Sequence, residues 1–313
     1  ENHQDKVLYC SDDKHPDDLV RGHINLLVKR AIALGYDPIR VLQSCILNPI
    51  DHYKLDVGLL QPGDPADFII VDNLSDFNVL KTFVDGQLVA ENGKTLIESI
   101  PATTPNNFNI NKISASDLFI KSNGKQIRII EALEGQLITN TIIDNPKVID
   151  SNMVSDIDKD YLKMVVINRY NQSKPAIAFI KNFGLKKGAI ASTVAHDSHN
   201  IIALGADDES IARAINLLVD CRGGIAVVNE SLEHVLPLPV AGLMSNIDGY
   251  EVAKAYEIID GLTKKFGSTL HAPFMTLSFM ALLVIPQLKL SDKGLFDGKS
   301  FSFTDLEVDQ EYK

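Results

Sequence analysis

The stretch Val7-Leu8-Tyr9-Cys10-Ser11-Asp12-Asp13-Lys14-His15-Pro16 decides how this sequence is interpreted, because a short apolar run ends abruptly in charged groups. Val7–Cys10 predicts a buried strand, and in a parallel (β/α) barrel the residues just past a strand line the active-site face. Carboxylates there, in this case Asp12 and Asp13, are candidate metal ligands or proton carriers. The alternative is a turn that caps the next helix, since Asp is a common N-cap residue.

The residues after Pro16 predict two helices. The first is capped by an aspartate of the pair 17–18, has apolar residues at helical spacing to residue 34, and stops at Gly35. The second begins at Asp37-Pro38, which places an N-cap before a proline at the first helical position. Asn48-Pro49 is expected to break it and to leave residues 52–53 in a short connection.

From Gly58 onward the pattern changes to that of strands. Gln61–Asp64 predicts a turn, and Asp67–Asp72 predicts an apolar strand. The dipeptide Asp85-Gly86 between two apolar runs predicts a hairpin, and Asn92-Gly93 predicts a further turn. A small group of strands joined by tight turns is therefore expected here.

Residues 101–107 are the best linker candidate, because they are rich in proline and threonine. The segment beyond them predicts an α/β or α+β domain in which most elements are strands. The expected strands are 127–130, 136–143, 164–168, 176–180, 189–194, 201–204 and 225–228, and the expected helices are 208–218 and 251–266.

The composition excludes several classes of function. The formal charge is −11 and no basic stripe is present, so neither nucleic acid nor an anionic membrane is expected as a partner. No apolar run reaches the roughly 20 residues of a membrane span. Cys10, Cys45 and Cys221 have no CxxC spacing, so neither disulfides nor a thiolate zinc site is expected, and a cytoplasmic location is predicted.

Three stretches carry a resemblance to a known family. Ser11–Asn25 resembles the segment at the last barrel strand of bacterial adenine deaminases, which belong to the amidohydrolase superfamily. Leu59–Asp72, which contains Pro-Gly-Asp-Pro-Ala-Asp, looks like that superfamily's return from the barrel to the small β-domain. Gly188–Asn200, which contains His-Asp-Ser-His, resembles a stretch peculiar to the adenine deaminase C-terminal domain, and Pro273–Leu282 resembles the end of that domain.

The resemblance implies three parts: residues 1–50 as the last βα unit of a TIM-like barrel, 51–100 as half of a composite β-sandwich domain, and 108–313 as a C-terminal α/β domain. The chain does not begin with methionine, and no His-x-His pair occurs in it. We therefore expect a C-terminal portion of a longer enzyme that is inactive alone, because a carboxylate pair does not hold a transition metal tightly.

The same resemblance implies hydrolysis of adenine to hypoxanthine and ammonia at a binuclear manganese or iron site. It implies that Asp12 binds metal and shuttles a proton, with Asp13 as the fallback. His15 and His23 could border the purine pocket or hydrogen-bond the acid. For His23 the competing expectation is a structural role within its helix, and Val20-Arg21-Gly22-His23 is one residue shorter than the family pattern.

A second polar cluster, Ala195-His196-Asp197-Ser198-His199-Asn200, lies between two apolar runs, so its side chains should converge at a strand end. We assign acid–base chemistry to His196 and His199, and substrate contacts to Asp197 and Ser198. The cluster is expected to complete or cover the purine pocket. A tight turn in which Asp197 and Asn200 satisfy backbone donors is the alternative.

Two other functions remain open at this stage. The chain could belong to an amidohydrolase that acts on a cyclic amide, or it could be a noncatalytic module that binds a metal or a partner. Unpaired strand edges of the half β-domain favour association, so a homo-oligomer is expected.

Overall fold

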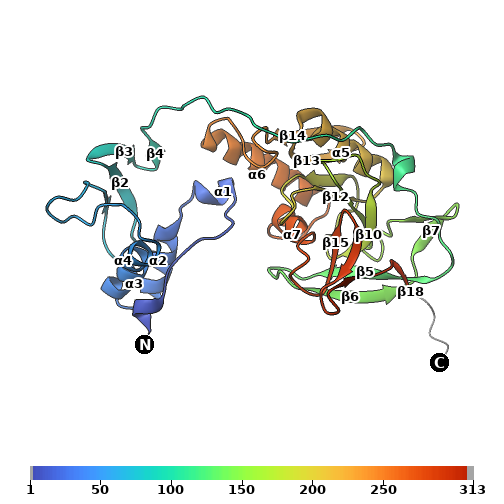
Figure 1. Ribbon diagram of the computed structural model, residues 1–313, viewed down its shortest axis with the longest axis horizontal. Coiled ribbons are helices and arrows are strands. Elements are labelled where there is room, and N and C mark those ends of the chain that lie inside the picture. Colours follow the sequence, from blue (N-terminus) through green and yellow to red (C-terminus); the bar gives the residue numbers. More distant parts are fainter. Residues whose placement is uncertain (1–2, 309–313) are drawn as a thin grey trace. The chain divides into compact units, whose positions relative to one another are not determined.

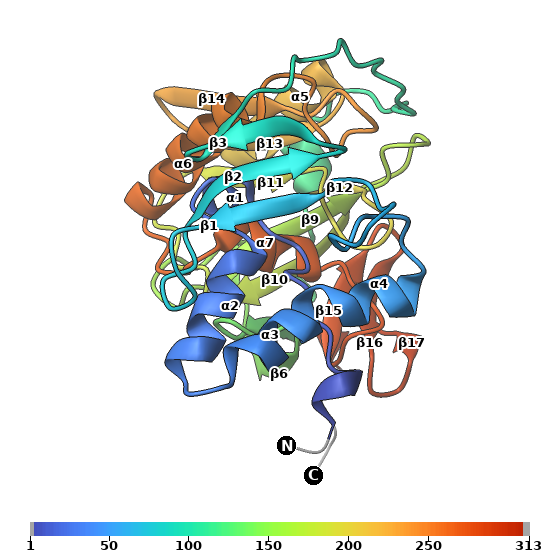
Figure 2. The same cartoon turned by 90° about the vertical axis from the view of Figure 1, so that its left-hand side faces the viewer.

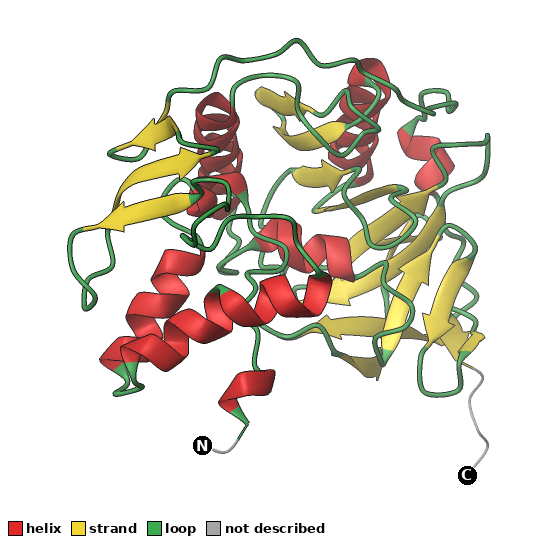
Figure 3. Cartoon of the chain, turned by 60° about the vertical axis from the view of Figure 1, so that its left-hand side comes forward, coloured by secondary structure: helices red, strands yellow, loops and turns green. Residues whose placement is uncertain are grey.

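The computed structural model describes residues 3–308 and divides the chain into two compact units. Unit 1 is Glu1–Pro101 with Asp248–Lys254, and unit 2 is Ala102–Ile247 with Ala255–Lys313. The change from unit 1 to unit 2 falls in the expected linker, whose residues form neither helix nor strand. Helices and strands occur in both units, which confirms the mixed α/β class (Figure 3). The three-part division at residues 50 and 108 stays a prediction.

Unit 1 begins with short helices around a small core. Asp37 is the N-cap of the second predicted helix, as expected, and its Oδ1 accepts the Arg40 N–H at 3.0 Å. The buried residues of the core are Val28, Ala31, Val41 and Phe77. The helices are η1 (Gln4–Lys6), α1 (Pro16–Leu19), α2 (Ile24–Ala33), α3 (Pro38–Cys45) and α4 (Leu47–Tyr53), and Figure 2 shows α2 and α3 beside each other.

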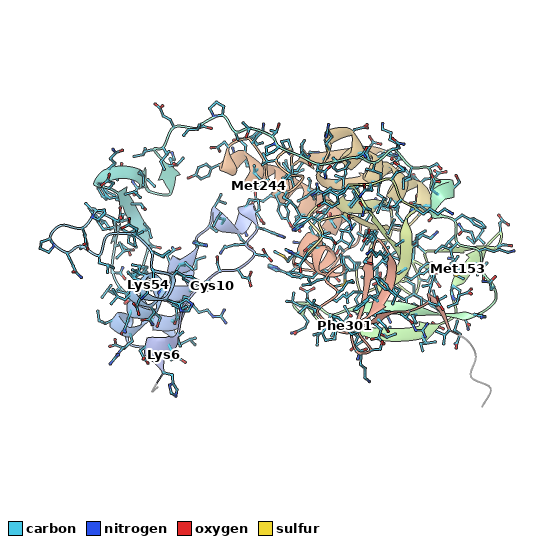
Figure 4. All side chains as sticks on the ribbon, in the orientation of Figure 1. Lys6, Cys10, Lys54, Met153, Met244 and Phe301 are labelled. Carbon is cyan, nitrogen blue, oxygen red and sulfur yellow. The ribbon has the colours of Figure 1, made fainter. Side chains whose placement is uncertain are left out.

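The strand predicted at Val7–Cys10 is not formed. These residues pair with no strand in the described part of the chain, and the Tyr9 N–H instead donates to the Ser44 carbonyl of α3 at 3.3 Å. A strand exists only through a ladder of hydrogen bonds to a neighbour, so an apolar run without that neighbour lies as an extended segment. Figure 4 labels Cys10 on this segment.

Two helix boundaries also differ from the prediction. The first helix is broken into α1 and α2 because Gly22 has a φ of +149°, outside the helical region. Asn48-Pro49 does not end the helical path, because Pro49 lies in the first turn of α4, where its missing N–H would have had no partner. Residues 52–53 are consequently helical and not a connection.

The strands of unit 1 form one antiparallel sheet of order β1-β2-β3-β4, as the turn residues predict. Asp85 and Gly86 have φ values of +49° and +75°, which the two-residue hairpin between β2 and β3 requires. Asp67 ties this turn to the chain before β1, because its carboxylate accepts the N–H groups of Asp85 and Gly58. The strands are β1 (Phe68–Val71), β2 (Val79–Val84), β3 (Gln87–Glu91) and β4 (Lys94–Thr95).

Unit 2 is built on a nine-stranded sheet. Along the main path the order is β14-β13-β11-β12-β9-β10-β5-β18, with β6 on β5. Among the described strands of this sheet only β10 and β5 pair in parallel, so the sheet is the α+β alternative of the prediction. Its strands are β5 (Gln126–Ala132), β6 (Thr139–Asp144), β9 (Leu162–Ile167), β10 (Ala176–Lys181), β11 (Ala189–Ser192), β12 (Ile201–Gly205), β13 (Gly224–Asn229), β14 (Leu232–Pro237) and β18 (Glu307–Val308).

The central strands of this sheet are covered on both faces. α5 (Asp208–Cys221) packs on β11, β12 and β13, and every second residue of the strands joins the same apolar cluster, for example Ala189 with Ala191 and Ile201 with Ala203. The residues between them, such as Ile190 and Ile202, are also fully buried. Figure 1 shows α5 lying along the sheet. Burial on both faces explains why these strands are apolar runs without alternation.

The remaining elements of unit 2 surround this sheet. Asp207 caps α5, with Oδ1 accepting the Ser210 N–H at 2.7 Å. The apolar stretch after residue 272 is core, with Phe274 and Leu277 buried in α7. The other elements are η2 (Ala115–Leu118), α6 (Gly249–Lys265), α7 (Pro273–Phe279), β7 (Lys147–Ile149), β8 (Asn152–Val154), β15 (Leu288–Ser291), β16 (Gly294–Asp297) and β17 (Ser302–Phe303).

Candidate functional site

The carboxylate pair of unit 1 lies on an exposed turn before α1. Asp12 adopts a left-handed conformation with φ of +51°, and its Oδ1 accepts the Asp13 N–H at 2.9 Å. His15 is the N-cap of α1 in extended conformation, and its side chain makes no capping hydrogen bond. The helix cap predicted for Asp17 or Asp18 therefore falls at His15, and both aspartates lie in the first turn.

His23 connects this turn to α2. It lies at the N-cap of α2, not inside a helix as the sequence predicted, because the chain breaks at Gly22. Its Nε2 is 2.6 Å from Ser11 Oγ, and its N–H donates to Asn25 Oδ1 at 2.7 Å. The structure thus brings His23 to Ser11, at the start of the carboxylate segment, and the role predicted for His23 at the site stays a prediction.

Unit 1 also contains an apolar cavity of about 510 Å³. It lies between the extended opening segment and helices α2 and α3, and Tyr9, Leu27 and Val41 are among its lining residues. Burial raises the pKa of the Tyr9 hydroxyl. None of the predicted site residues lines the cavity. The cavity is therefore not the purine pocket that was predicted beside Asp12 and His15.

The second cluster lies where the sequence predicted it, at a strand end in unit 2. Residues 193–200 connect β11 to β12, two neighbouring antiparallel strands in the middle of the sheet. Thr193 anchors the beginning of this loop, because its Oγ1 donates to the Gly242 carbonyl at 2.6 Å and accepts the Gly224 N–H at 2.9 Å. Asp197 and Ser198 are exposed at its tip, whereas His196 and His199 are half-buried.

The two histidines are held close together. Their ring centroids are 5.6 Å apart. The His196 ring stacks on Phe279 at the end of α7 with a centroid distance of 4.6 Å, and the backbone N–H of His196 donates to the Ser278 carbonyl at 3.1 Å. The His199 N–H donates to the Ala195 carbonyl at 2.7 Å, which closes the loop. The segment is therefore a tight turn, but not in the way the alternative predicted, because Asn200 Oδ1 has no hydrogen-bond partner within residues 3–308. The turn instead brings the two histidine rings together.

The loop is supported by two residues that the sequence analysis did not single out. The Tyr170 hydroxyl donates to the Ser198 carbonyl at 2.9 Å, and buried Arg169 donates to the Tyr170 hydroxyl at 3.0 Å. Both follow β9 directly, so the rule that drew attention to Asp12, polar residues just past a strand, would have found them. No pattern in the sequence predicts the stacking of His196 on Phe279.

Neither cluster alone meets the requirement of a binuclear metal site. Among residues 3–308 the structure contains no group of three or more His, Cys, Asp or Glu side chains that could hold a metal ion. Asp12 and Asp13 supply two carboxylates, and the loop of unit 2 supplies two imidazoles. A tightly held transition metal needs more ligands in a fixed geometry than either set provides.

Comparison with known proteins defines the class. Residues 1–89 match the Amidohydrolase family, so the chain is related to that class of hydrolases. Residues 136–302, more than half of the chain, match the family described as "Adenine deaminase C-terminal domain", and the chain belongs to this family. The match disfavours an amidohydrolase that acts on cyclic amides.

Curated relatives agree with this assignment. The chain is 54% identical over 301 residues to "Adenine deaminase" from Sulfurovum sp. (strain NBC37-1), covering 96% of this chain and 55% of the relative. It is 49% identical over 325 residues to "Adenine deaminase" from Methanosarcina mazei, covering 99% of this chain and 58% of the relative. For "Adenine deaminase" from Borreliella burgdorferi the identity is 45%, covering 96% and 55%.

The chain spans about half the length of the curated relatives that it matches. Within residues 3–308, no helix combines the length and the apolar character that crossing a membrane requires.

Proposed function

We propose that this chain is part of an adenine deaminase that hydrolyses adenine to hypoxanthine and ammonia. The observation that carries the proposal is the extent of the similarity: 301 of the chain's 313 residues align with a relative of that name. The similarity therefore extends far beyond the two polar clusters. Residues 136–302, which contain the histidine loop, also match the family of the C-terminal domain.

Asp12 is assigned the transfer of a proton. Water must lose a proton to attack the purine ring, and the departing nitrogen must gain one, so a carboxylate that accepts and returns a proton serves both steps. The exposed position of Asp12 and its fixed Oδ1, which accepts the Asp13 N–H, support this role. Asp13, His15 and His23 are assigned contacts with the substrate or with Asp12.

The proposal includes a binuclear manganese or iron site in the longer enzyme, with Asp12 as one ligand. Asp12 and Asp13 do not form such a site by themselves, and no group of three donors occurs in residues 3–308. The chain on its own is therefore expected to be inactive.

His196 and His199 are assigned acid–base chemistry, and Asp197 and Ser198 are assigned contacts with the purine. The closeness of the two rings and the exposure of the loop tip support this assignment. Imidazole is suited to the role because its ordinary pKa lies near neutral pH.

The chain is further proposed to act in the cytoplasm as a homo-oligomer, with adenine as its partner and no nucleic acid or membrane. Its net charge of −11 and its three free cysteines, Cys10, Cys45 and Cys221, support these assignments.

The test measures hypoxanthine formed from adenine, with manganese or ferrous iron supplied. This chain is compared with a chimera in which it replaces the matched part of the Sulfurovum relative, and with that intact relative. We expect turnover from the chimera and none from the chain alone. An inactive chimera that folds and binds metal would contradict the proposal, and turnover by the chain alone would move the catalytic centre to the histidine loop.

A further inference from the structure

We propose that Arg169 and Tyr170 are positioning residues, which hold the loop 195–200 so that His199 keeps one orientation and one neutral tautomer. The inference deepens the assignment of acid–base chemistry to this loop and rests on that proposed function. It is carried by a chain of hydrogen bonds from β9 to the loop.

Tyr170 is the direct contact. Its backbone is fixed by Asn168, whose Oδ1 accepts the N–H groups of Tyr170 at 2.9 Å and Asn171 at 3.0 Å. Its hydroxyl then meets the Ser198 carbonyl at 2.9 Å. A carbonyl oxygen only accepts, so the phenol must donate its single proton to Ser198.

Arg169 fixes the orientation of that phenol. Its Nη2 donates to the Tyr170 hydroxyl at 3.0 Å and to the Ala241 carbonyl at 2.8 Å. Because a guanidinium only donates, the hydroxyl oxygen is occupied as an acceptor and its proton is directed at Ser198. A hydrogen bond from a charged donor is also stronger than one between neutral groups.

Burying the Arg169 side chain costs stability, because its charge is only partly paired. The residue is 2% exposed, and its Nε and Nη1 have no hydrogen-bond partner among residues 3–308. Buried charges without full pairing are costly, and apolar residues of similar volume are often more stable in such places. Contacts of the guanidinium with the rings of Tyr170 and Phe108, at 4.8 and 5.8 Å from their centroids, offset only part of this cost.

The surrounding backbone is shaped to admit this side chain. A Cβ placed on Gly242 would lie 1.9 Å from Arg169 Nη1, so a larger residue there would displace the guanidinium, and the φ of +68° also favours glycine. The site therefore accommodates the guanidinium at a further cost in backbone freedom. Both the buried guanidinium of Arg169 and the glycine at position 242 cost stability, which indicates that the guanidinium does more than fill space.

The effect of these bonds is greatest at His199. The Ser198 carbonyl and the His199 N–H belong to the same peptide group, so the bond from Tyr170 to this carbonyl fixes that group. The His199 N–H in turn donates to the Ala195 carbonyl. Its Nδ1 accepts the Ala195 N–H at 3.4 Å, so in the neutral ring the proton lies on Nε2. His196 is held separately by α7, through Ser278 and Phe279. Loss of the tyrosine hydroxyl should therefore disturb His199 more than His196.

The experiment compares Tyr170→Phe with Tyr161→Phe in this chain, labelled with ¹⁵N at histidine. Each variant removes one tyrosine hydroxyl and keeps the ring. Tyr170→Phe loses the bond to Ser198 together with the bond from Arg169, whereas Tyr161 donates to Asp144 and does not contact the loop. Long-range ¹H–¹⁵N spectra report the tautomer of each imidazole, and hydrogen exchange reports its amide. His196→Gln and His199→Gln assign the signals.

We expect wild type and Tyr161→Phe to show the Nε2–H tautomer at His199 and a protected His199 amide. In Tyr170→Phe the tautomers should mix, and the amide should exchange about fivefold faster, as the loss of one hydrogen bond implies. Equal spectra and equal exchange in the three proteins would overturn the inference. The inference would also be overturned if the His199 amide of the wild-type chain exchanged as fast as an amide in an unstructured peptide. This measurement does not depend on whether a variant folds.

Kinetics of the chimera provide an independent arm. Tyr170→Phe should lower kcat for adenine about tenfold and leave KM within about twofold, because a supporting partner affects the reacting group more than binding. Arg169→Lys, which keeps the charge but loses the fork of donors, should lie between wild type and Tyr170→Phe. If the wild-type chimera lacks turnover, the proposed function fails, while the spectra still decide the role of Tyr170.

Discussion

Two polar segments that resemble one another in sequence differ in how neighbouring elements hold them. Ser11–His15 and Ala195–Asn200 both follow an apolar run and combine carboxylate, hydroxyl and imidazole groups. In unit 1 the run before the cluster pairs with no strand within residues 3–308, and both aspartates are exposed. In unit 2 the loop joins two fully buried strands and is held from β9 and α7.

The difference shows that a strand-end site depends on the strand's neighbours more than on its own residues. The loop of unit 2 receives its geometry from elements that this chain contains. In the carboxylate turn, Ser11 contacts His23 and Asp12 accepts the neighbouring Asp13 N–H, and no strand within residues 3–308 pairs with the apolar run before it. Its chemistry should therefore depend on further elements, whereas the geometry of the histidine loop should persist in this chain alone.

The largest expected effect concerns the carboxylate pair. In the chimera, Asp12→Asn should lower kcat for adenine by about 100- to 10,000-fold, as loss of a general acid–base group does. Steady-state kinetics measure this change. Asp13→Asn is the matched control and should cost about tenfold or less; if Asp13→Asn proved the more damaging, the two roles would be reversed.

The next prediction compares the two cores with one substitution. Val227→Ala, in the fully buried strand β13, should lower the free energy of unfolding by about 2–3 kcal/mol, because the packed sheet cannot collapse around the lost methyl groups. Val41→Ala should cost only about 1 kcal/mol, because Val41 already borders the cavity of unit 1. Denaturant unfolding of each unit measures both values. Equal losses would mean that the two cores are equally well packed.

The interior of unit 2 should also show in a pH profile. Burial lowers the pKa of Lys289 from 10.5 to about 8, while its Nζ donates to the Leu137 carbonyl at 2.7 Å. The unfolded chain then binds more protons than the folded one between pH 8 and 10.5, so the free energy of unfolding should rise across that window, by up to about 3 kcal/mol. Below pH 8 both states are protonated and the penalty is present in full.

Lys289→Met tests this assignment, because the variant lacks the titrating group. Its free energy of unfolding, measured with denaturant at several pH values, should not show the rise between pH 8 and 10.5. A wild-type profile that is flat in this range, or a variant that keeps the rise, would contradict the account.

The smallest effect is expected at the hairpin of unit 1. The N–H groups of Asp85 and Gly58 hold the pKa of Asp67 below its ordinary 3.8. The stabilisation is present above that ordinary value and is lost as the pH falls through the lower folded value. Exchange of the Asp85 amide should therefore accelerate in acid in wild type. In Asp67→Asn it should be fast at every pH, and a slow Asp85 amide in that variant would refute the prediction.

The sequence predicted the central elements of unit 2 and part of unit 1, but it did not predict β7, β8, α7 or β14 to β18. Asp85-Gly86 identified the hairpin of unit 1 and Asp37 the start of α3, because turns and caps depend on a few neighbouring residues. The opening strand was wrong because a strand requires a partner. The break at Gly22 was missed because the apolar spacing continues across it, and Pro49 was misread because a proline is tolerated in the first turn of a helix.

The candidate site divides in the same way. The sequence by itself determined which groups could react, because Asp12, His196 and His199 stand out by their chemistry and by their place after apolar runs. Only the tertiary structure decided how they are held: that His196 stacks on Phe279, and that Tyr170 reaches Ser198. These contacts join residues 28 to 83 positions apart, and local patterns carry no information about distances that only the packing of the sheet creates.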